Sequence, residues 1–433
     1  MNRKMARDYH TEFKKRKMKK VNKPLAWLLT HILKILCKKQ NVSFSYDEEY
    51  LALKDKQIIL LCQHKSSNDF VYVFGGIKRL DVHILVGYQN IFQKGVYHIL
   101  KSLGAIAKML YQPDVAAVAQ TLQALKLGES VVIFPEGIQS TSGSTHPINP
   151  GTMHLLMKCK LPVALATIEG SYFAKPRFTR ELRKGEIKVH YSKLFDPADF
   201  DTYSQEVLYQ RLLDSFKYNE FEEHKENKIA FRGKTPNITG LDNIIYKCPH
   251  CLAEHQFSIT GDVMRCSACG FAVSMDEYYD IHPQNHSLPF ANIDEWYKWQ
   301  RQLLAREVQS PDFSMSLNVM LRKIDTQKLR KNYSLVYDGE GVLTITNRGL
   351  VYRGTKGEEQ VELQFAAKNV YSLSISLAYD FDMYCQGRYY NFKILENEKH
   401  MTKWMIAAEE IHNLYDPAWK EASEQVYEYA KEK

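Results

Sequence analysis

The stretch His64-Lys65-Ser66-Ser67-Asn68-Asp69 directly follows an apolar run at residues 58–62. A second polar group, Phe134-Pro135-Glu136-Gly137, follows the similar apolar run at residues 131–133. Short apolar runs bounded by polar residues are typical of buried strands, and α/β folds build their sites just beyond such strands. We therefore expect both polar groups to belong to the active site of an α/β domain.

The spacing of His64 and Asp69 restricts how the two side chains can meet. On one straight helix they would lie about 140° apart, so they can pair only if His64 precedes the helix and Asp69 lies in its first turn. Ser66, Ser67 and Asn68 are favourable N-cap residues for such a break. The arrangement suits a histidine general base held by a carboxylate, and it needs no serine or cysteine nucleophile. A capping or packing role is the alternative for a lone histidine.

Four blocks between residues 58 and 170 resemble the lysophospholipid acyltransferase family, typified by 1-acyl-glycerol-3-phosphate acyltransferase. Their order along the chain makes the resemblance specific. The blocks are the motif with His64 and Asp69, then Leu103-Gly104-Ala105-Ile106, then Phe134-Pro135-Glu136-Gly137, and finally Leu161-Pro162-Val163-Ala164-Leu165-Ala166.

This resemblance implies a reaction and a role for each motif residue. A fatty acyl group would move from a thioester, either acyl-CoA or acyl carrier protein, to the hydroxyl of a lysophospholipid such as 1-acyl-glycerol-3-phosphate, in phospholipid biosynthesis. His64 would deprotonate the hydroxyl, and Asp69 would orient the imidazole. Glu136 and Gly137 would shape the acceptor pocket. The oxyanion formed during attack would require fixed N–H donors, such as backbone amides near these blocks.

Two departures from the family pattern concern the acceptor. Family members usually carry an arginine shortly after the Gly-Ala-Ile block and another in a Thr-Arg-Ser sequence after the Glu-Gly. The corresponding stretches here read Ala107-Lys108-Met109-Leu110 and Ile138-Gln139-Ser140. Both guanidinium groups that could grip a phosphate in bidentate fashion are therefore missing, and Lys108 remains as a point charge. The identity of the acceptor stays open.

The positive charge of the chain is concentrated at its start. Ten of the first 23 residues are Lys or Arg and two are acidic, whereas the whole chain carries a net charge of +8. Residues 25–37 then form an apolar segment that would extend about 20 Å as a helix, too short to span the roughly 30 Å hydrocarbon core. We expect residues 1–40 to comprise a basic segment and an amphipathic helix that anchors the protein to an anionic membrane surface. A core helix is the alternative.

Two C-x2-C pairs, separated by fourteen residues, predict a metal site. Four thiolates at this spacing complete a tetrahedral structural Zn²⁺ site and leave no position open for catalysis. Residues 246–275 thus resemble a zinc ribbon, which we expect to act as a folding staple or protein contact, with no nucleic acid as a partner. The four expected ligands are Cys248, Cys251, Cys266 and Cys269.

The remaining cysteines, Cys37, Cys62, Cys159 and Cys385, stand alone at irregular spacing. This pattern disfavours a disulfide framework and indicates a reducing compartment.

The chain is expected to contain an α/β acyltransferase domain at residues 41–220, a linker at 221–245, the zinc ribbon at 246–275 and a helical connector at 276–330. Residues 331–433 contain several short strand-like runs with turns between them, followed by a helix. They weakly resemble a PH-like or GRAM-like domain, which would bind lipid or protein or serve architecture alone.

Together these features predict a peripheral or monotopic acyltransferase on the cytoplasmic face of the membrane. Its partners would be the lysophospholipid acceptor, the anionic membrane surface and, if the donor is not acyl-CoA, acyl carrier protein. The competing hypothesis is an acyltransferase-like protein with weak or no turnover that binds lipid or tethers membranes. The intact His64, Asp69 and Glu136 favour the enzyme, and the two missing arginines favour the alternative.

Overall fold

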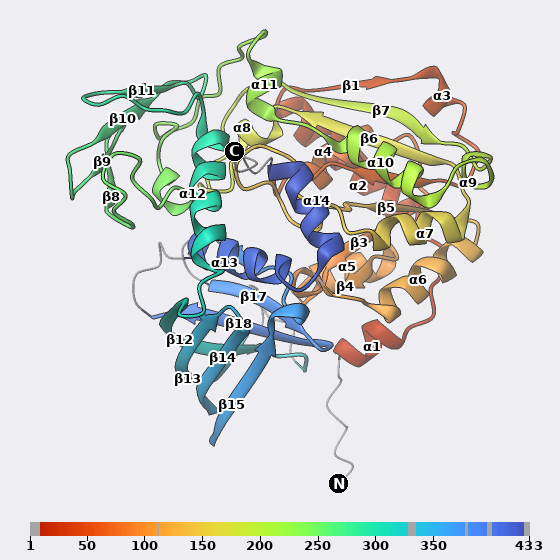
Figure 1. Ribbon diagram of the computed structural model, residues 1–433. Coiled ribbons are helices and arrows are strands. Elements are labelled where there is room, and N and C mark those ends of the chain that lie inside the picture. Colours follow the sequence, from red (N-terminus) through yellow and green to blue (C-terminus); the bar gives the residue numbers. More distant parts are fainter. Residues whose placement is uncertain are drawn as a thin grey trace.

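The computed structural model describes residues 9–92, 94–110, 112–327, 335–376, 380–395 and 401–427. These residues form three sheets, and helix α12 (Ile293–Glu307) lies between the second and third of them (Figure 1). One continuous group of buried apolar side chains extends from Tyr72 beside the first sheet, through Trp296 on α12, to Phe392 in the third sheet. The three sheets therefore share a hydrophobic core.

The first sheet has seven strands in the order β1-β7-β6-β2-β5-β3-β4. Strands β7 and β1 are parallel to each other and run opposite to the remaining five. Most connections between the parallel strands contain a helix, as parallel pairing requires. The strands are β1 (Val42–Tyr46), β2 (Ile59–Cys62), β3 (Val82–Gly87), β4 (Ile106–Lys108), β5 (Ser130–Ile133), β6 (Val163–Glu169) and β7 (Ile187–Phe195).

Helices cover both faces of this sheet, so its central strands are apolar throughout. On β2, Ile59 and Leu61 face one buried cluster, whereas Leu60 and Cys62 face the other. This arrangement confirms the expected α/β domain. The first cluster includes side chains of α6 (Val115–Lys126), α7 (Gly151–Cys159) and α10 (Gln205–Phe216), and the second includes side chains of α2 (Lys23–Lys39), α4 (Asp69–Gly76) and α8 (Ser171–Ala174). Shorter helices are α3 (Glu48–Leu51), α5 (Val96–Ser102), α9 (Asp199–Thr202) and α11 (Glu220–His224).

The N-terminal segment is packed against the domain from α1 (Tyr9–Lys15) onward. Phe13 is fully buried against Tyr97, and the Val21 amide donates to the Glu129 carboxylate over 2.7 Å. The basic residues before Tyr9 lie outside the described residues. The described part of the expected basic segment is thus fixed to the fold.

Helix α2 turns its largest apolar side chains outward. Thr30 and Cys37 are buried, and Cys37 lies against Gly75 of α4. None of the helices in the described residues is both long and apolar enough to cross a bilayer. The exposed apolar side chains of α2 are Trp27, Leu28, Ile32, Ile35 and Leu36.

The second sheet is small and antiparallel, and the cysteines of the two C-x2-C motifs lie in it or beside it. Its core side chain Phe257 packs edge-on against Trp296 of α12, whose indole N–H donates to the Lys247 carbonyl over 3.2 Å. The strands lie in the order β11-β10-β9-β8, with bounds β8 (Phe257–Thr260), β9 (Val263–Cys266), β10 (Ala272–Met275) and β11 (Ile281–Pro283).

The third sheet has seven antiparallel strands in the order β15-β14-β13-β12-β18-β17-β16. Helices α13 (Met401–Asn413) and α14 (Pro417–Tyr427) follow it. Several strands closed by a helix were expected here, whereas the PH-like assignment itself stays a prediction. The strands are β12 (Ser314–Ile324), β13 (Leu335–Thr346), β14 (Gly349–Lys356), β15 (Glu359–Ala366), β16 (Ser374–Ser376), β17 (Asp380–Cys385) and β18 (Arg388–Ile394).

Two expected boundaries differ from the structure. Residues 221–245 are not a free linker, because Phe231, Ile238 and Ile245 are fully buried in the shared core. The third sheet does not begin at residue 331 either. Its strand β12 lies inside the expected connector at 276–330 and pairs along its length with β13. In residues 221–245 the buried apolar side chains are scattered through a largely polar stretch. In β12, by contrast, apolar and polar residues alternate as in a half-buried strand, a pattern that the expected connector did not take into account.

Candidate active site

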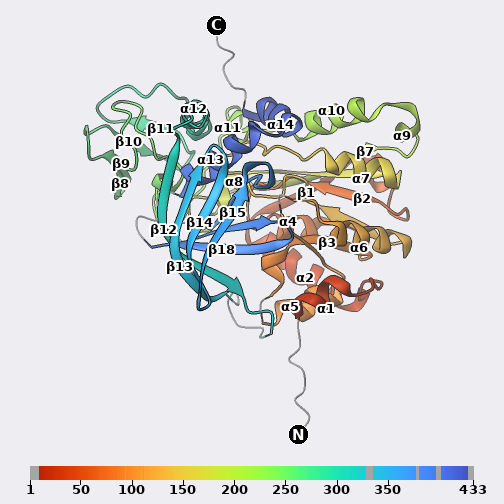
Figure 2. The same cartoon turned by 60° about the horizontal axis from the view of Figure 1, so that its bottom comes forward.

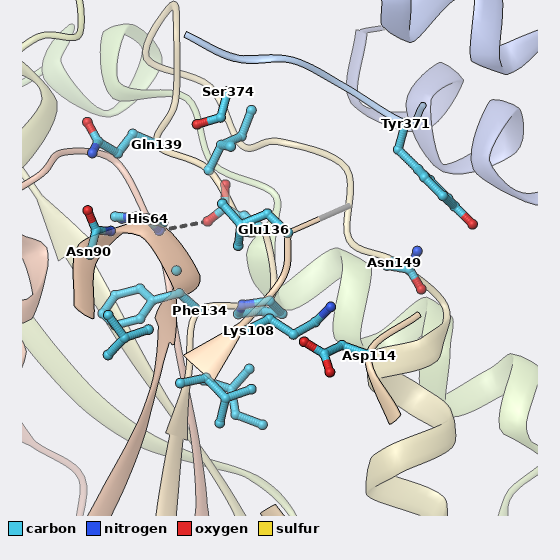
Figure 3. Close-up of a pocket in the computed structure, with 18 of the residues that line it drawn as sticks. His64, Asn90, Lys108, Asp114, Phe134, Glu136, Gln139, Asn149, Tyr371 and Ser374 are labelled. Carbon is cyan, nitrogen blue, oxygen red and sulfur yellow. Dashed lines mark hydrogen bonds between the residues drawn. The ribbon is translucent and has the colours of Figure 1, made fainter. Parts of the chain in front are cut away.

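Adjacent strands place the two polar groups side by side. β2 pairs in parallel with β5, with Leu60 opposite Val132, so the residues that follow these strands emerge at the same edge of the sheet. His64 follows β2 and Glu136 follows β5 (Figure 3). The sheet edge therefore brings together the two groups that the sequence places far apart.

His64 precedes α4, and Asp69 is its first residue, as the spacing required. His64 Nδ1 lies 3.1 Å from Asp69 Oδ2. The same carboxylate oxygen accepts the Ser66 backbone N–H over 2.7 Å. Because a carboxylate only accepts, the pairing holds the proton on Nδ1 and leaves Nε2 as the ring's proton acceptor.

The Asp69 carboxyl and the His64 imidazole have different surroundings. Asp69 is fully buried, whereas the His64 side chain is 22 % exposed and contacts the Phe134 ring. No described residue is hydrogen-bonded to His64 Nε2, and the ring lines a cavity. This is the geometry of a general base oriented by a buried carboxylate.

Glu136 fixes the backbone around the base. Its Oε1 accepts the His64 backbone N–H and its Oε2 accepts the His146 backbone N–H, each over 2.8 Å. Burial raises the pKa of this carboxyl, and the nearby Lys65 ammonium opposes that rise. Glu136 also lines the cavity next to His64. Gly137 adopts a φ of 75°, which a glycine tolerates and which turns the chain after Glu136.

The Leu-Gly-Ala-Ile block has a structural explanation. Gly104 has a φ of 68°, and a Cβ at this position would lie 2.2 Å from His83 Nδ1. The His83 ring is buried, with Nδ1 2.9 Å from the Gly104 carbonyl and Nε2 2.9 Å from the Glu129 carboxylate. The block thus packs the start of β4 against this second histidine.

A buried charged group lies behind the motif. Lys65 is fully buried, with its ammonium 4.1 Å from the Tyr218 ring centroid and 3.5 Å from Thr145 Oγ1. Burial lowers the pKa of Lys65. Burial likewise raises the pKa of the neighbouring Glu220 to about 8. The sequence displayed Lys65 beside His64, but only the structure shows that its side chain points away from solvent.

Helix α12 holds the segment that follows Gly137. The Asp294 carboxylate accepts from the hydroxyls of Ser142 and Ser144 over 2.5 and 2.8 Å. Further along the same segment, the Ser140 backbone N–H donates to the His64 carbonyl over 2.9 Å. Helix α12, in the C-terminal half of the chain, therefore stabilises the segment that is hydrogen-bonded to the His64 backbone.

The cavity beside His64 has a volume of about 990 Å³. Its floor comes from the first sheet and the helices around it, and a further wall comes from the C-terminal part of the chain. Ser374 lies across the cavity from Lys108 in Figure 3. The C-terminal residues that line the cavity are Tyr371, Ser374, Ile375, Asp382 and Trp419.

Lys108, the expected phosphate contact, lines the cavity but is already hydrogen-bonded. Its ammonium donates to the carbonyls of Met109 and Gln112 over 2.6 and 2.7 Å. Burial lowers the pKa of Lys108 to about 8, although the Asp114 carboxylate opposes this shift. The ammonium can therefore bind a ligand only through the N–H donor that these two carbonyls do not engage.

Three further cationic side chains line the cavity, and the sequence did not predict them. Lys175, Arg177 and Arg180 line it from the segment that follows β6 and α8. Because β6 is the other parallel neighbour of β2, its carboxyl end lies at the same sheet edge as His64. The signal was the sequence Lys-Pro-Arg-Phe-Thr-Arg soon after a third buried strand.

The four paired cysteines come together as expected. Their sulfur atoms all lie within 4.8 Å of one another, with Cys248 and Cys269 3.7 Å apart and Cys251 and Cys266 3.8 Å apart. A tetrahedral site with Zn–S bonds of about 2.3 Å has edges of about 3.8 Å. The cluster fits a tetrahedral metal ion and lies in the second sheet, apart from the cavity.

Comparison with known proteins agrees with the geometry of the first sheet. Residues 42–168 match the family model described as Acyltransferase. A 1-acyl-sn-glycerol-3-phosphate acyltransferase from Bacillus subtilis (strain 168) is 24% identical over 155 residues, which are 36% of this chain and 74% of that protein. A protein of the same name from Cocos nucifera is 24% identical over 127 residues, 29% of this chain and 36% of that protein.

Among solved structures, the 1-acyl-sn-glycerophosphate (LPA) acyltransferase PlsC from Thermotoga maritima matches with a TM-score of 0.39 and 18% sequence identity, over 44% of this chain and 76% of that one. The family model covers the segment that carries His64, Asp69 and Glu136. Residues 42–168 are thus similar to an acyltransferase domain.

Proposed function

We propose that the protein transfers a fatty acyl group from a thioester to the hydroxyl of a lysophospholipid, with 1-acyl-glycerol-3-phosphate as the acceptor. The observation that carries the proposal is the His64–Asp69 pair, whose free ring nitrogen faces a cavity of about 990 Å³. The names of both curated relatives support this acceptor.

In the proposed reaction His64 Nε2 removes the proton of the acceptor hydroxyl as its oxygen attacks the thioester carbonyl. The new ester C–O bond forms and the C–S bond breaks. The imidazolium, balanced by Asp69, returns the proton to the departing thiolate. Glu136 contributes by holding the His64 main chain, because its carboxylate accepts that residue's N–H.

The test is an assay of the purified protein with acyl-CoA or acyl-loaded acyl carrier protein and a panel of lysolipids, with products identified by mass. A new diacyl product that appears with one donor and depends on His64 supports the proposal. Binding of lysolipid without any product, in the presence of either donor, would instead support the membrane-tethering alternative.

We also propose that α2 attaches the protein to the cytoplasmic surface of an anionic membrane. Its outward face combines Trp27 and Ile35, each more than half exposed, with the exposed lysines 34, 38 and 39. Burying such apolar surface in the lipid interface is favourable, and each nearby cation adds about 1 kcal/mol at an anionic surface. The core-helix alternative is disfavoured because the largest side chains point away from the core.

Flotation with vesicles measures this attachment. Replacing Trp27 and Ile35 by Ser should release the protein from anionic vesicles and leave its melting temperature nearly unchanged, because both side chains are more than half exposed and neither belongs to the core. A matched pair of substitutions at the exposed Tyr203 and Val207, near α10, should leave flotation intact. Unchanged flotation of the α2 variant would place the attachment elsewhere.

The cysteine cluster is proposed to hold a structural Zn²⁺. Four thiolates would bind the ion and leave no position for water or substrate. Elemental analysis under reducing conditions should find one zinc per chain, and Cys248→Ser with Cys251→Ser should lose it and unfold the region around residues 245–275. Iron in place of zinc, or substoichiometric metal, would contradict this assignment.

A further inference from the structure

Arg177 occupies an unusual position in the cavity. Its Nη1 donates to the Gln139 carbonyl over 2.9 Å and to Thr141 Oγ1 over 3.3 Å, and its Nη2 donates to the Ile375 carbonyl over 3.3 Å. Gln139 belongs to the segment after Glu136, and Ile375 belongs to β16 of the third sheet. The guanidinium is thus held between the acyltransferase domain and the C-terminal sheet.

Those contacts fix the plane of the guanidinium but leave part of it available. The group has five N–H donors in a planar fork, of which three are engaged. Nε–H and one N–H of Nη2 have no acceptor among the described residues, and Nε and Nη2 together form the edge of the fork that can bind two oxygens of a phosphate. The carbonyls of Gln139 and Ile375 hold the guanidinium in place and so preorganise it.

The local charge favours an anion. Within the described part of the chain, no carboxylate lies within ion-pair distance of Arg177 or Lys175, although both line the cavity. The three carboxyls that line the cavity are hydrogen-bonded elsewhere. Glu136 accepts two backbone N–H groups, Asp114 accepts the Met109 and Ala117 amides, and Asp382 accepts from the side chains of Tyr389 and Asn391.

This site is next to the base. The Gln139 carbonyl that accepts from Arg177 belongs to the residue before Ser140, whose N–H donates to the His64 carbonyl. In 1-acyl-glycerol-3-phosphate the acylated hydroxyl and the phosphate ester are on neighbouring carbons. An acceptor that places its hydroxyl at His64 would therefore place its phosphate a short distance away, within the same cavity.

We propose that Arg177, supported by Lys175, binds the phosphate of the acceptor and so determines that the substrate is a phosphate monoester. This inference rests on the proposed function of the cavity. It also gives the third sheet a role in specificity, because the Ile375 carbonyl orients the guanidinium.

The test compares wild type with Arg177→Gln and Arg177→Lys, and uses Arg211→Gln on α10, away from the cavity, as the matched control. Acceptors are 1-acyl-glycerol-3-phosphate and the corresponding monoacylglycerol, with acyl-CoA as donor. Loss of a bidentate, charge-assisted contact should raise the KM for the phosphate acceptor about tenfold or more in Arg177→Gln, with partial rescue in Arg177→Lys. The KM values for monoacylglycerol and acyl-CoA should stay within about twofold, as in the control.

Other outcomes overturn the proposal. A rise in the KM for acyl-CoA alone would assign Arg177 to a phosphate of the donor. Equal changes for both acceptors, or a lower kcat with both KM values unchanged, would make its role purely structural. Calorimetric titration with glycerol 3-phosphate separates this inference from the enzyme hypothesis. Binding that is lost in Arg177→Gln supports the site even if wild type shows no turnover, and no binding to active wild type contradicts it.

Discussion

Two histidine–carboxylate pairs beside the first sheet have almost the same separation and different surroundings. His64 lies 3.1 Å from Asp69, and His83 lies 2.9 Å from Glu129. Both ring nitrogens of His83 face acceptors in the core, whereas one ring nitrogen of His64 faces the cavity. The pairing by itself therefore does not identify a base. The open nitrogen of His64 beside the cavity is the reason that we propose this histidine, and not His83, as the base.

The largest expected effect separates the two histidines. His64→Ala should lower kcat by about 10²-fold or more, because it removes the acid–base group, and should change the free energy of unfolding little. His83→Ala should do the reverse. It leaves the buried Glu129 carboxylate with the Val21 amide but without the imidazole, which costs about 1–3 kcal/mol of stability, while turnover per folded molecule is retained. Denaturant unfolding and steady-state kinetics on both variants check this, and near-normal kcat in His64→Ala would refute the mechanism.

A smaller effect should separate the two carboxylates. Asp69→Asn keeps the shape of the side chain but weakens the support for the imidazolium, so kcat should fall about tenfold or more. Glu129→Gln should change the melting temperature instead. The measurement is the kcat of each variant together with its thermal unfolding. Equal loss of kcat in both would mean that the two pairs do not differ in role.

The smallest effect concerns Lys108, an intermediate case that lines the cavity yet is bonded to two carbonyls. Its pKa is lowered to about 8, so the side chain is cationic below that pH and neutral above it. If it contributes to phosphate binding, the KM for 1-acyl-glycerol-3-phosphate should rise as the pH increases through 8, by about fivefold. In Lys108→Met the KM should not depend on pH in this range. It should equal, at every pH, the high value that wild type reaches above pH 8. A wild-type KM that is constant from pH 7 to 9 would remove Lys108 from the acceptor site.

The sequence was informative where the chemistry is local. The order of buried strand, polar group and helix start predicted the relation of His64 to Asp69, because helix geometry leaves few ways to pair them. The two C-x2-C pairs predicted the meeting of the cysteines for a similar reason, since the spacing places both thiolates of a pair within reach of one ion and two pairs complete a tetrahedral site. Glu136 was found through its position after the second strand, although its bond to the His64 backbone was not.

The features that the sequence did not predict depend on contacts between distant segments. The C-terminal wall of the cavity is formed by residues of β16, β17, α14 and the segment before β16, all of them far from His64 in the sequence. Lys108 was predicted to contact the phosphate because it lies close to the position of a missing arginine. Nothing in the sequence indicated that two carbonyls hold its ammonium. The sequence did not indicate Arg177, because its guanidinium is held by the carbonyls of Gln139 and Ile375, which are both distant from it in the sequence.

The shared core of the three sheets has a consequence for how the molecule unfolds. Side chains such as Phe231, Ile245 and Trp296 bridge the first sheet to the others, so no set of residues can separate without exposing apolar surface on both sides. We expect a single cooperative thermal transition, with loss of turnover and loss of C-terminal structure at the same temperature. A chain cut after residue 220 should aggregate, because it would retain His64 and Glu136 but expose the apolar surface that the rest of the protein covers.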